Sequence, residues 1–154
     1  MKKGRIYVVA VLLVLVTFLC ACKDEVTTKT AAQIKDIVVD GRYEIQGSYY
    51  FSEGSATDSF TALLTNNWTV SFTDYKDYTS SCDAEFDFSK LAWADDDESN
   101  VREISEGYII IEGMTGDERY QLISRKGNTI LYISGPVKDK ANINLYALGM
   151  GYYE

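Results

Sequence analysis

Residues 120–133 read YQLISRKGNTILYI, and this stretch decides the fold class. Apolar residues gather at 120–123 and again at 129–133, whereas Lys126, Gly127 and Asn128 between them are typical of a turn. A link this short cannot hold a crossover helix, so the two segments must pair antiparallel. The stretch therefore indicates a β-hairpin, and with it a domain built mainly from antiparallel strands.

Alternation of apolar and polar residues extends this interpretation along the chain. Trp68, Val70 and Phe72 are separated by single hydroxyl residues, which is the period of a half-buried strand. Segments of this kind, or richer in apolar residues, predict eight strands, at 43–51, 59–64, 68–73, 83–88, 108–111, 120–123, 129–133 and 143–148. We expect one all-β domain whose eight antiparallel strands close into a barrel or stack as a sandwich, with the barrel favoured because it has no exposed edges.

One short helix is predicted before the strands. Thr30 and Gln33 have the spacing of a capping box, which satisfies free N–H groups at a helix start. Ile34 and Val38 follow at helical spacing, and Gly41 can end the helix.

The first 22 residues resemble the leader of a bacterial lipoprotein. Lys2, Lys3 and Arg5 precede a 16-residue apolar run, which is shorter than the roughly 20 residues of a membrane-spanning helix. The run ends in LCAC, which is similar to a lipobox, and the resemblance implies lipid on Cys22. We therefore predict a signal peptide at 1–21, a lipidated tether at 22–33 and the β domain at 34–154. A plain secretory signal cut near the same place is the alternative.

The three residues after Cys22 resemble a localisation signal. Lys23, Asp24 and Glu25 resemble the short export signal that some Bacteroidota lipoproteins carry after the lipidated cysteine. The resemblance implies anchoring in the outer membrane, with display on the cell surface. The alternative is that these charges only solvate the start of the tether.

Charge narrows the class of partner. The whole chain has a formal net charge of −8, and loss of residues 1–21 would leave 12 basic and 23 acidic side chains, or −11. An acidic surface repels phosphate backbones, so nucleic-acid binding is not expected. A basic protein partner would be favoured, although the charge also serves solubility.

Catalysis is not predicted. The chain has no His, which removes Ser-His triads and imidazole metal sites. The turn around Gly113 lacks the Lys and Ser/Thr of a phosphate-binding loop. Cys82 is the one cysteine outside the leader, and we expect it to be buried and inert, with an interchain disulfide as the alternative.

An acidic cluster supplies the one metal hypothesis. Asp95, Asp97, Ser99, Glu103 and Glu106 occupy positions 1, 3, 5, 9 and 12 of an EF-hand-like frame, whose oxygen ligands would suit Ca²⁺. A solvated acidic loop is the alternative interpretation.

A family resemblance supports the barrel. A short helix leading into Gly41, Arg42 and Tyr43 is similar to the lipocalin N-terminal pattern Gly-x-Trp, with Tyr in place of Trp. The resemblance implies a barrel that holds a small apolar molecule or is filled by its own side chains. Aromatic residues of the predicted strands are the candidate cavity wall, although they could also fill a core or stack on sugars: Tyr43, Trp68, Phe72, Phe86 and Phe88.

These patterns predict a lipid-anchored binding protein of the cell envelope that captures a small apolar or amphipathic ligand in a β-barrel. Two alternatives remain open: an acidic interaction or inhibitor module for a basic protein, and an accessory subunit of a surface complex.

Overall fold

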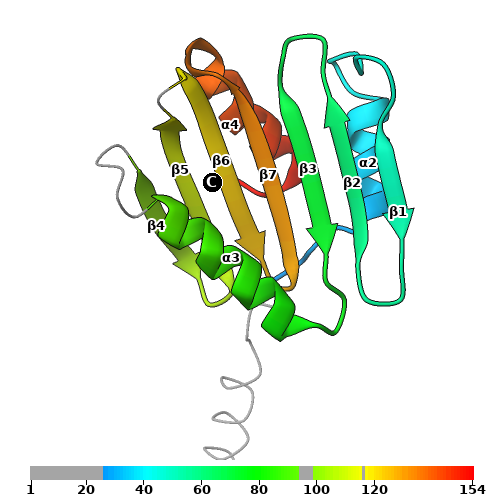
Figure 1. The fold of residues 1–154 in the computed structure, drawn as a ribbon, viewed down its shortest axis with the longest axis vertical. Coiled ribbons are helices and arrows are strands. Elements are labelled where there is room, and N and C mark those ends of the chain that lie inside the picture. The colour runs from blue at the N-terminus through cyan, green and yellow to red at the C-terminus, as the bar shows by residue number, and fades with distance from the viewer. Residues whose placement is uncertain (1–25, 94–98, 116) are drawn as a thin grey trace, which may run out of the picture.

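The computed structural model describes residues 26–93, 99–115 and 117–154, leaving out the side chains of 91–93. These residues form one open sheet of seven strands with three α-helices and a short 3₁₀ helix (Figure 1). The elements in chain order are α2 (Ala31–Val39), β1 (Tyr50–Glu53), β2 (Asp58–Leu63), β3 (Thr69–Asp74), α3 (Thr79–Trp93), β4 (Asn100–Ser105), β5 (Tyr108–Thr115), β6 (Arg119–Lys126), β7 (Thr129–Pro136), η1 (Val137–Asp139) and α4 (Lys140–Met150).

The sheet is antiparallel throughout, as the short links predicted. Its strand order is β1-β2-β3-β7-β6-β5-β4. The predicted hairpin is formed by β6 and β7, where Lys126 pairs with Thr129 and Gly127 takes the positive φ of a tight turn. The prediction of an eight-stranded, lipocalin-like barrel or sandwich is wrong, because β1 and β4 end the sheet on opposite sides without pairing to each other.

Residues 83–88, predicted as a strand, belong to helix α3. Cys82 and Phe86 are both buried and lie four residues apart, whereas Phe88 is 73% exposed. The buried positions therefore follow the helical period, and the alternation of Phe86 and Phe88 is coincidental.

Residues 143–148, also predicted as a strand, lie within helix α4. Its buried residues are Ile143, Ala147 and Met150, at helical spacing, and Gly151 ends it in the left-handed conformation. Leu145 and Leu148, which suggested an apolar strand, point to solvent.

The predicted strand at 43–51 is realised only at its end, as β1, with an isolated bridge between Ile45 and Leu64. Strand β4 was not predicted. The helix prediction is confirmed in α2, where the Thr30 hydroxyl accepts from the Gln33 N–H at 3.3 Å and the Gln33 side chain accepts from the Thr30 N–H at 2.9 Å.

The helices divide unequally between the two faces of the sheet. Helices α2 and α4 cover one face, the back face, and bury the larger core against it. Helix α3 lies on the other face, which we call the front face and which is turned toward the viewer in Figure 1. There Phe86 packs with Ile111, Ile123 and Ile130 of β5, β6 and β7 in a smaller core. No helix of the described segments is both long and apolar enough to cross a membrane.

Candidate functional site

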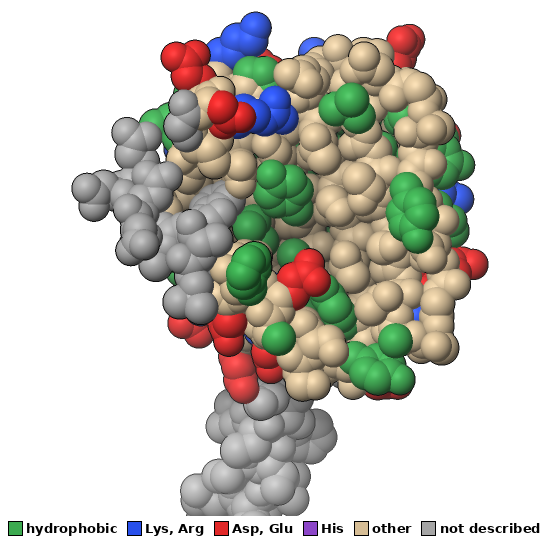
Figure 2. All heavy atoms as spheres, in the orientation of Figure 1, with side chains coloured by type: hydrophobic (Ala, Val, Ile, Leu, Met, Phe, Trp, Pro, Cys, Tyr) green, Lys and Arg blue, Asp and Glu red, His purple; other side chains and the backbone are tan. Residues whose placement is uncertain are grey.

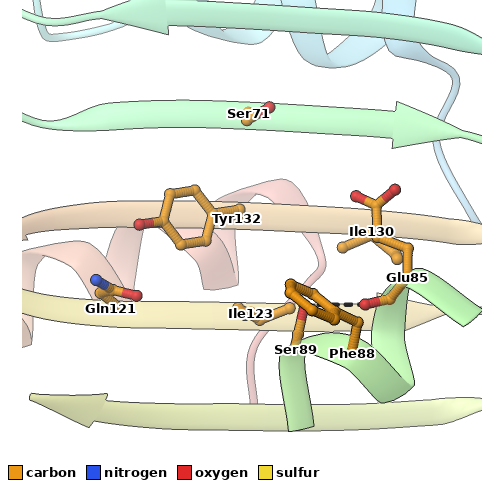
Figure 3. Close-up of a pocket in the computed structure, with 8 residues that line it drawn as sticks. All are labelled: Ser71, Glu85, Phe88, Ser89, Gln121, Ile123, Ile130 and Tyr132. Atoms are coloured by element: carbon orange, nitrogen blue, oxygen red, sulfur yellow. Dashed lines mark hydrogen bonds between the residues drawn. The ribbon is translucent and has the colours of Figure 1, made fainter. Parts of the chain in front are cut away.

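A groove of about 350 Å³ lies on the front face, between α3 and the sheet (Figure 3). It exists because α3 runs obliquely across β4, β5 and β6 to the end of β7 (Figure 1), where Phe86 packs with Ile130. The rest of β7 and all of β3 are left uncovered beside the helix, whose edge forms one wall of the groove. Three residues come from the helix and five from the strands: Glu85, Phe88, Ser89, Ser71, Gln121, Ile123, Ile130 and Tyr132.

The floor of the groove is largely apolar. Ile123 of β6 and Ile130 of β7 face α3, and Tyr132, two residues along β7 from Ile130, pairs directly with Ile123. Phe88 projects from the helix with 73% of its surface exposed. A phenyl ring so exposed beside an aliphatic floor offers a place for a ring or short chain to be sandwiched.

The rim of the groove is polar and holds its shape through hydrogen bonds. The Glu85 carboxylate accepts a hydrogen bond from the Tyr75 hydroxyl. The Ser89 hydroxyl donates to the Glu85 carbonyl oxygen at 3.0 Å (Figure 3), and on the far side Ser71 shares a 2.9 Å hydrogen bond with Thr61. Burial, and then the carboxylate, raise the pKa of Tyr75, so its hydroxyl remains a donor at neutral pH.

Helix α3 is fixed to the sheet on the side away from the groove. Arg125 of β6 forms an ion pair with Asp83 at 2.5 Å and its guanidinium lies 5.8 Å from the centre of the Phe86 ring. Cys82 is fully buried, and its thiol donates a weak hydrogen bond to the Gly127 carbonyl at 3.9 Å. Burial raises the pKa of Cys82, which keeps the thiol protonated and unreactive, as expected.

The predicted cavity-lining residues are divided between the two faces. Tyr43, Trp68 and Phe72 lie on the back face, where Tyr43 packs on Trp68 with a centroid distance of 4.6 Å. Phe86 is in the front core, and of the five only Phe88 lines the groove. Tyr43 precedes β1 and is not part of a strand.

Sequence reasoning missed Glu85, Ser89, Gln121 and Tyr132. A helical interpretation of residues 79–93 would have placed Glu85, Phe88 and Ser89 on one face, because they follow the spacing i, i+3, i+4. The sequence signal for Tyr132 was its hydroxyl, since it is the one residue with a polar group in the apolar run at 130–133.

Of the candidate calcium ligands, Ser99 and Glu106 lie within the described residues and are not close together. Asp95 and Asp97 lie outside the described residues. Ser99 and Glu106 flank β4, and six extended residues between them span roughly 20 Å. Within the described part of the chain no three acidic, Cys or His side chains are grouped to hold a metal.

A second polar cluster lies on the back face around Glu112, which is almost fully buried in β5. Its carboxylate lies 3.4 Å from Arg102 and 3.9 Å from Lys140. The Arg102 guanidinium also lies 4.7 Å from the centre of the Tyr153 ring, so the cluster fastens the C-terminal segment to β4 and β5. We infer that the cluster around Glu112 stabilises the fold and does not bind a ligand.

Cys22, the predicted site of lipid attachment, lies outside the described residues. No family model matches the chain, and neither do any curated proteins or solved structures.

Proposed function

We propose that the protein is a binding protein of the cell envelope, anchored through lipid on Cys22, which takes up a small amphipathic ligand in the groove between α3 and the front face. The observation that carries the proposal is the groove itself, where an apolar floor and exposed Phe88 lie beside the fixed carboxylate of Glu85. The ligand would lie on the surface of the sheet, since there is no barrel interior to enclose it.

The size and lining of the groove support a small ligand. About 350 Å³ falls at the lower end of the range for small-molecule sites, and the mixture of apolar floor with few polar groups is usual for them. Glu85 is the one charged residue in the lining, so a neutral or cationic ligand is favoured over an anion.

Binding is favoured over hydrolysis by the same lining. Glycosidic hydrolysis normally needs two carboxyl groups across the scissile bond. The residues described around the groove supply one, Glu85, and it is already bonded to Tyr75.

The proposal of a lipid anchor is supported by the leader sequence, which ends in the lipobox-like LCAC. Lipid chains on Cys22 would partition into a bilayer at about 0.8 kcal/mol per buried CH₂, and with more than one chain the attachment is stable. In this proposal the lipid is inserted in the outer membrane, and the β domain is displayed on the cell surface. The alternative of an acidic module for a basic protein has less support, because the groove and the open strands beside it present few acidic side chains.

The test uses a chain beginning at Lys23, which retains every helix and strand of the described residues. N-phenyl-1-naphthylamine, a neutral lipophilic probe, fluoresces on entering an apolar site, and we expect saturable binding. Phe88→Ala should weaken that binding at least tenfold. The control Leu148→Ala removes a side chain that is 49% exposed on α4, behind the sheet, and should leave it unchanged.

Absence of saturable binding by the unmodified protein would contradict the proposal. So would equal affinities for the Phe88→Ala and Leu148→Ala proteins.

A further inference from the structure

The open part of the front face is uncharged. Strands β1, β2, β3 and β7 present only hydroxyl, aromatic, aliphatic and proline residues there: Tyr50, Ser52, Ser59, Thr61, Leu63, Thr69, Ser71, Thr73, Ile130, Tyr132, Ser134 and Pro136. In Figure 2 one acidic side chain lies near the middle of the view and the other charged side chains lie toward its rim, whereas the rest of the sheet surface carries separate hydrophobic groups among polar, uncharged ones. Such a surface is unexpected on a chain with 23 acidic residues.

The nearest cations are already engaged. Arg119, at one end of β6, donates from Nε to the Ser134 hydroxyl at 3.1 Å and from its guanidinium to the Asn67 carbonyl at 3.2 Å. Arg125, at the other end of the strand, is paired with Asp83. The open strands themselves therefore present no cation to a phosphate or another anion, which disfavours nucleic acid and anionic lipid headgroups as ligands.

One row of residues crosses this face and leads into the groove. In the register of the sheet Tyr50 pairs with Thr61, Thr61 with Ser71, and Ser71 with Tyr132. Three interstrand spacings of about 4.8 Å place Tyr132 roughly 14 Å from Tyr50. Tyr50 is 62% exposed, so an aromatic ring stands at each end of a short row of hydroxyls.

This chemistry suits a carbohydrate. A sugar ring carries C–H groups on its faces, which stack on aromatic rings, and hydroxyls at its edges, which exchange hydrogen bonds with Ser, Thr, Gln and Glu side chains. Tyr50 and Leu63 are diagonal neighbours at one edge of the face. Ser and Thr residues of β2 and β3 separate them from Ile130 and Tyr132 of β7, so the face lacks the continuous apolar core of a stable protein interface.

We propose that the small amphipathic unit taken up by the groove is one sugar of a neutral polysaccharide, and that the rest of the polysaccharide chain lies across the front face from the groove to Tyr50. One sugar occupies the groove between Phe88 and Tyr132, with its hydroxyls on Glu85 and Gln121, and the following sugars lie along Ser71 and Thr61 toward Tyr50. This inference rests on the proposed function and adds the class of ligand and the length of the site.

The test is electrophoresis of the protein beginning at Lys23 through native gels that contain a soluble neutral polysaccharide. The panel comprises a mixed-linkage β-glucan, xylan, galactomannan, dextran and glycogen. We expect at least one to retard the protein, and Tyr50→Ala to weaken that retardation at least fivefold although Tyr50 is distant from the groove.

The matched control is Tyr49→Ala. Tyr49 is the chain neighbour of Tyr50 and is 44% exposed, but its ring packs against Phe60, which belongs to the core of the back face. This variant should be retarded like the unmodified protein. Thermal unfolding of both variants would establish that they are folded.

Two results would overturn the inference while leaving the proposed function in place: no retardation by any polysaccharide from a protein that binds the naphthylamine probe, or equal retardation of the Tyr50→Ala and Tyr49→Ala proteins. Loss of probe binding in the unmodified protein would instead overturn the proposed function and the inference together.

Discussion

The Tyr75 hydroxyl donates a hydrogen bond to the Glu85 carboxylate, joining the residue that follows β3 to the middle of α3. Tyr75 is itself held in place, since its N–H donates to the Asn128 carbonyl of the β6–β7 turn at 2.9 Å. Glu85, the one charged residue in the described lining of the groove, is thus held by Tyr75, and Tyr75 is held in turn by Asn128 of the β6–β7 turn.

We expect Tyr75→Phe to cost about 0.5–1.5 kcal/mol of unfolding free energy, the net value of one hydrogen bond. The loss stays small because Glu85 is exposed and can be hydrated instead. Urea unfolding measures it, and Tyr78→Phe, at a half-exposed ring three residues on, should change stability by less than 0.5 kcal/mol, as surface changes usually do. Equal effects of the two substitutions would show that the Tyr75–Glu85 bond does not contribute.

Truncation of two phenylalanines of α3 should have different effects on stability and on binding. Phe86→Ala removes a ring that is 1% exposed and should cost about 3–5 kcal/mol. Phe88→Ala removes an exposed ring and should cost less than about 0.5 kcal/mol of unfolding free energy while weakening probe binding at least tenfold. Chemical denaturation of both proteins checks this, and a large loss of stability in Phe88→Ala would mean that the ring is part of the core.

Gly135 lies where α4 and Trp68 meet β7. A Cβ at this position would come within 2.5 Å of Trp68 Cδ1 and 2.9 Å of Ile143 Cδ1, so Gly135→Ala should destabilise by about 1–3 kcal/mol through overpacking. Gly149→Ala is the matched control, because a Cβ there meets nothing within 4 Å in the last turn of α4, and it should stabilise slightly, by less than about 1 kcal/mol. Melting temperatures that move in the same direction would contradict the packing.

Stability should fall at alkaline pH. Burial raises the pKa of Tyr108 and of Tyr146 to about 12, so between pH 10 and 12 the unfolded chain loses protons that the folded chain keeps. Their contribution is fully present below pH 10 and is lost as the pH rises through the folded values. Urea midpoints at pH 8 and pH 11 measure the loss, and an unchanged midpoint would contradict it.

Tyr146→Phe separates this effect from general alkaline damage. The Tyr146 hydroxyl is buried without a hydrogen-bond partner among the described residues, so its removal should leave stability at pH 8 equal or higher. The loss between pH 8 and pH 11 should become smaller. A loss identical to that of the unmodified protein would show that Tyr146 does not contribute.

Local patterns predicted much of the sheet. The capping box at Thr30, the alternation from Trp68 to Phe72 and the turn at Gly127 each depend on near neighbours, and each forms as expected. The pairing of β3 with β7, which sets Val70 beside Ile133, joins residues far apart in the chain and leaves no local signal.

The candidate site was harder to predict because it depends on one ambiguous segment. Residues 82–88 satisfy a strand period through Ala84, Phe86 and Phe88 and a helical period through Cys82 and Phe86. Only packing against Ile111 and Ile123 decides between them, and that contact is tertiary. Once the segment is a helix, Glu85, Phe88 and Ser89 share a face and the groove follows.

The central claim is that ligand enters the groove between α3 and the front face. Amide chemical-shift mapping of the ¹⁵N-labelled protein during titration with N-phenyl-1-naphthylamine tests it most directly. We predict saturable shifts concentrated at residues 85–89, 121–123 and 130–132. Shifts concentrated on α2 or α4 behind the sheet, or none at all, would contradict the account.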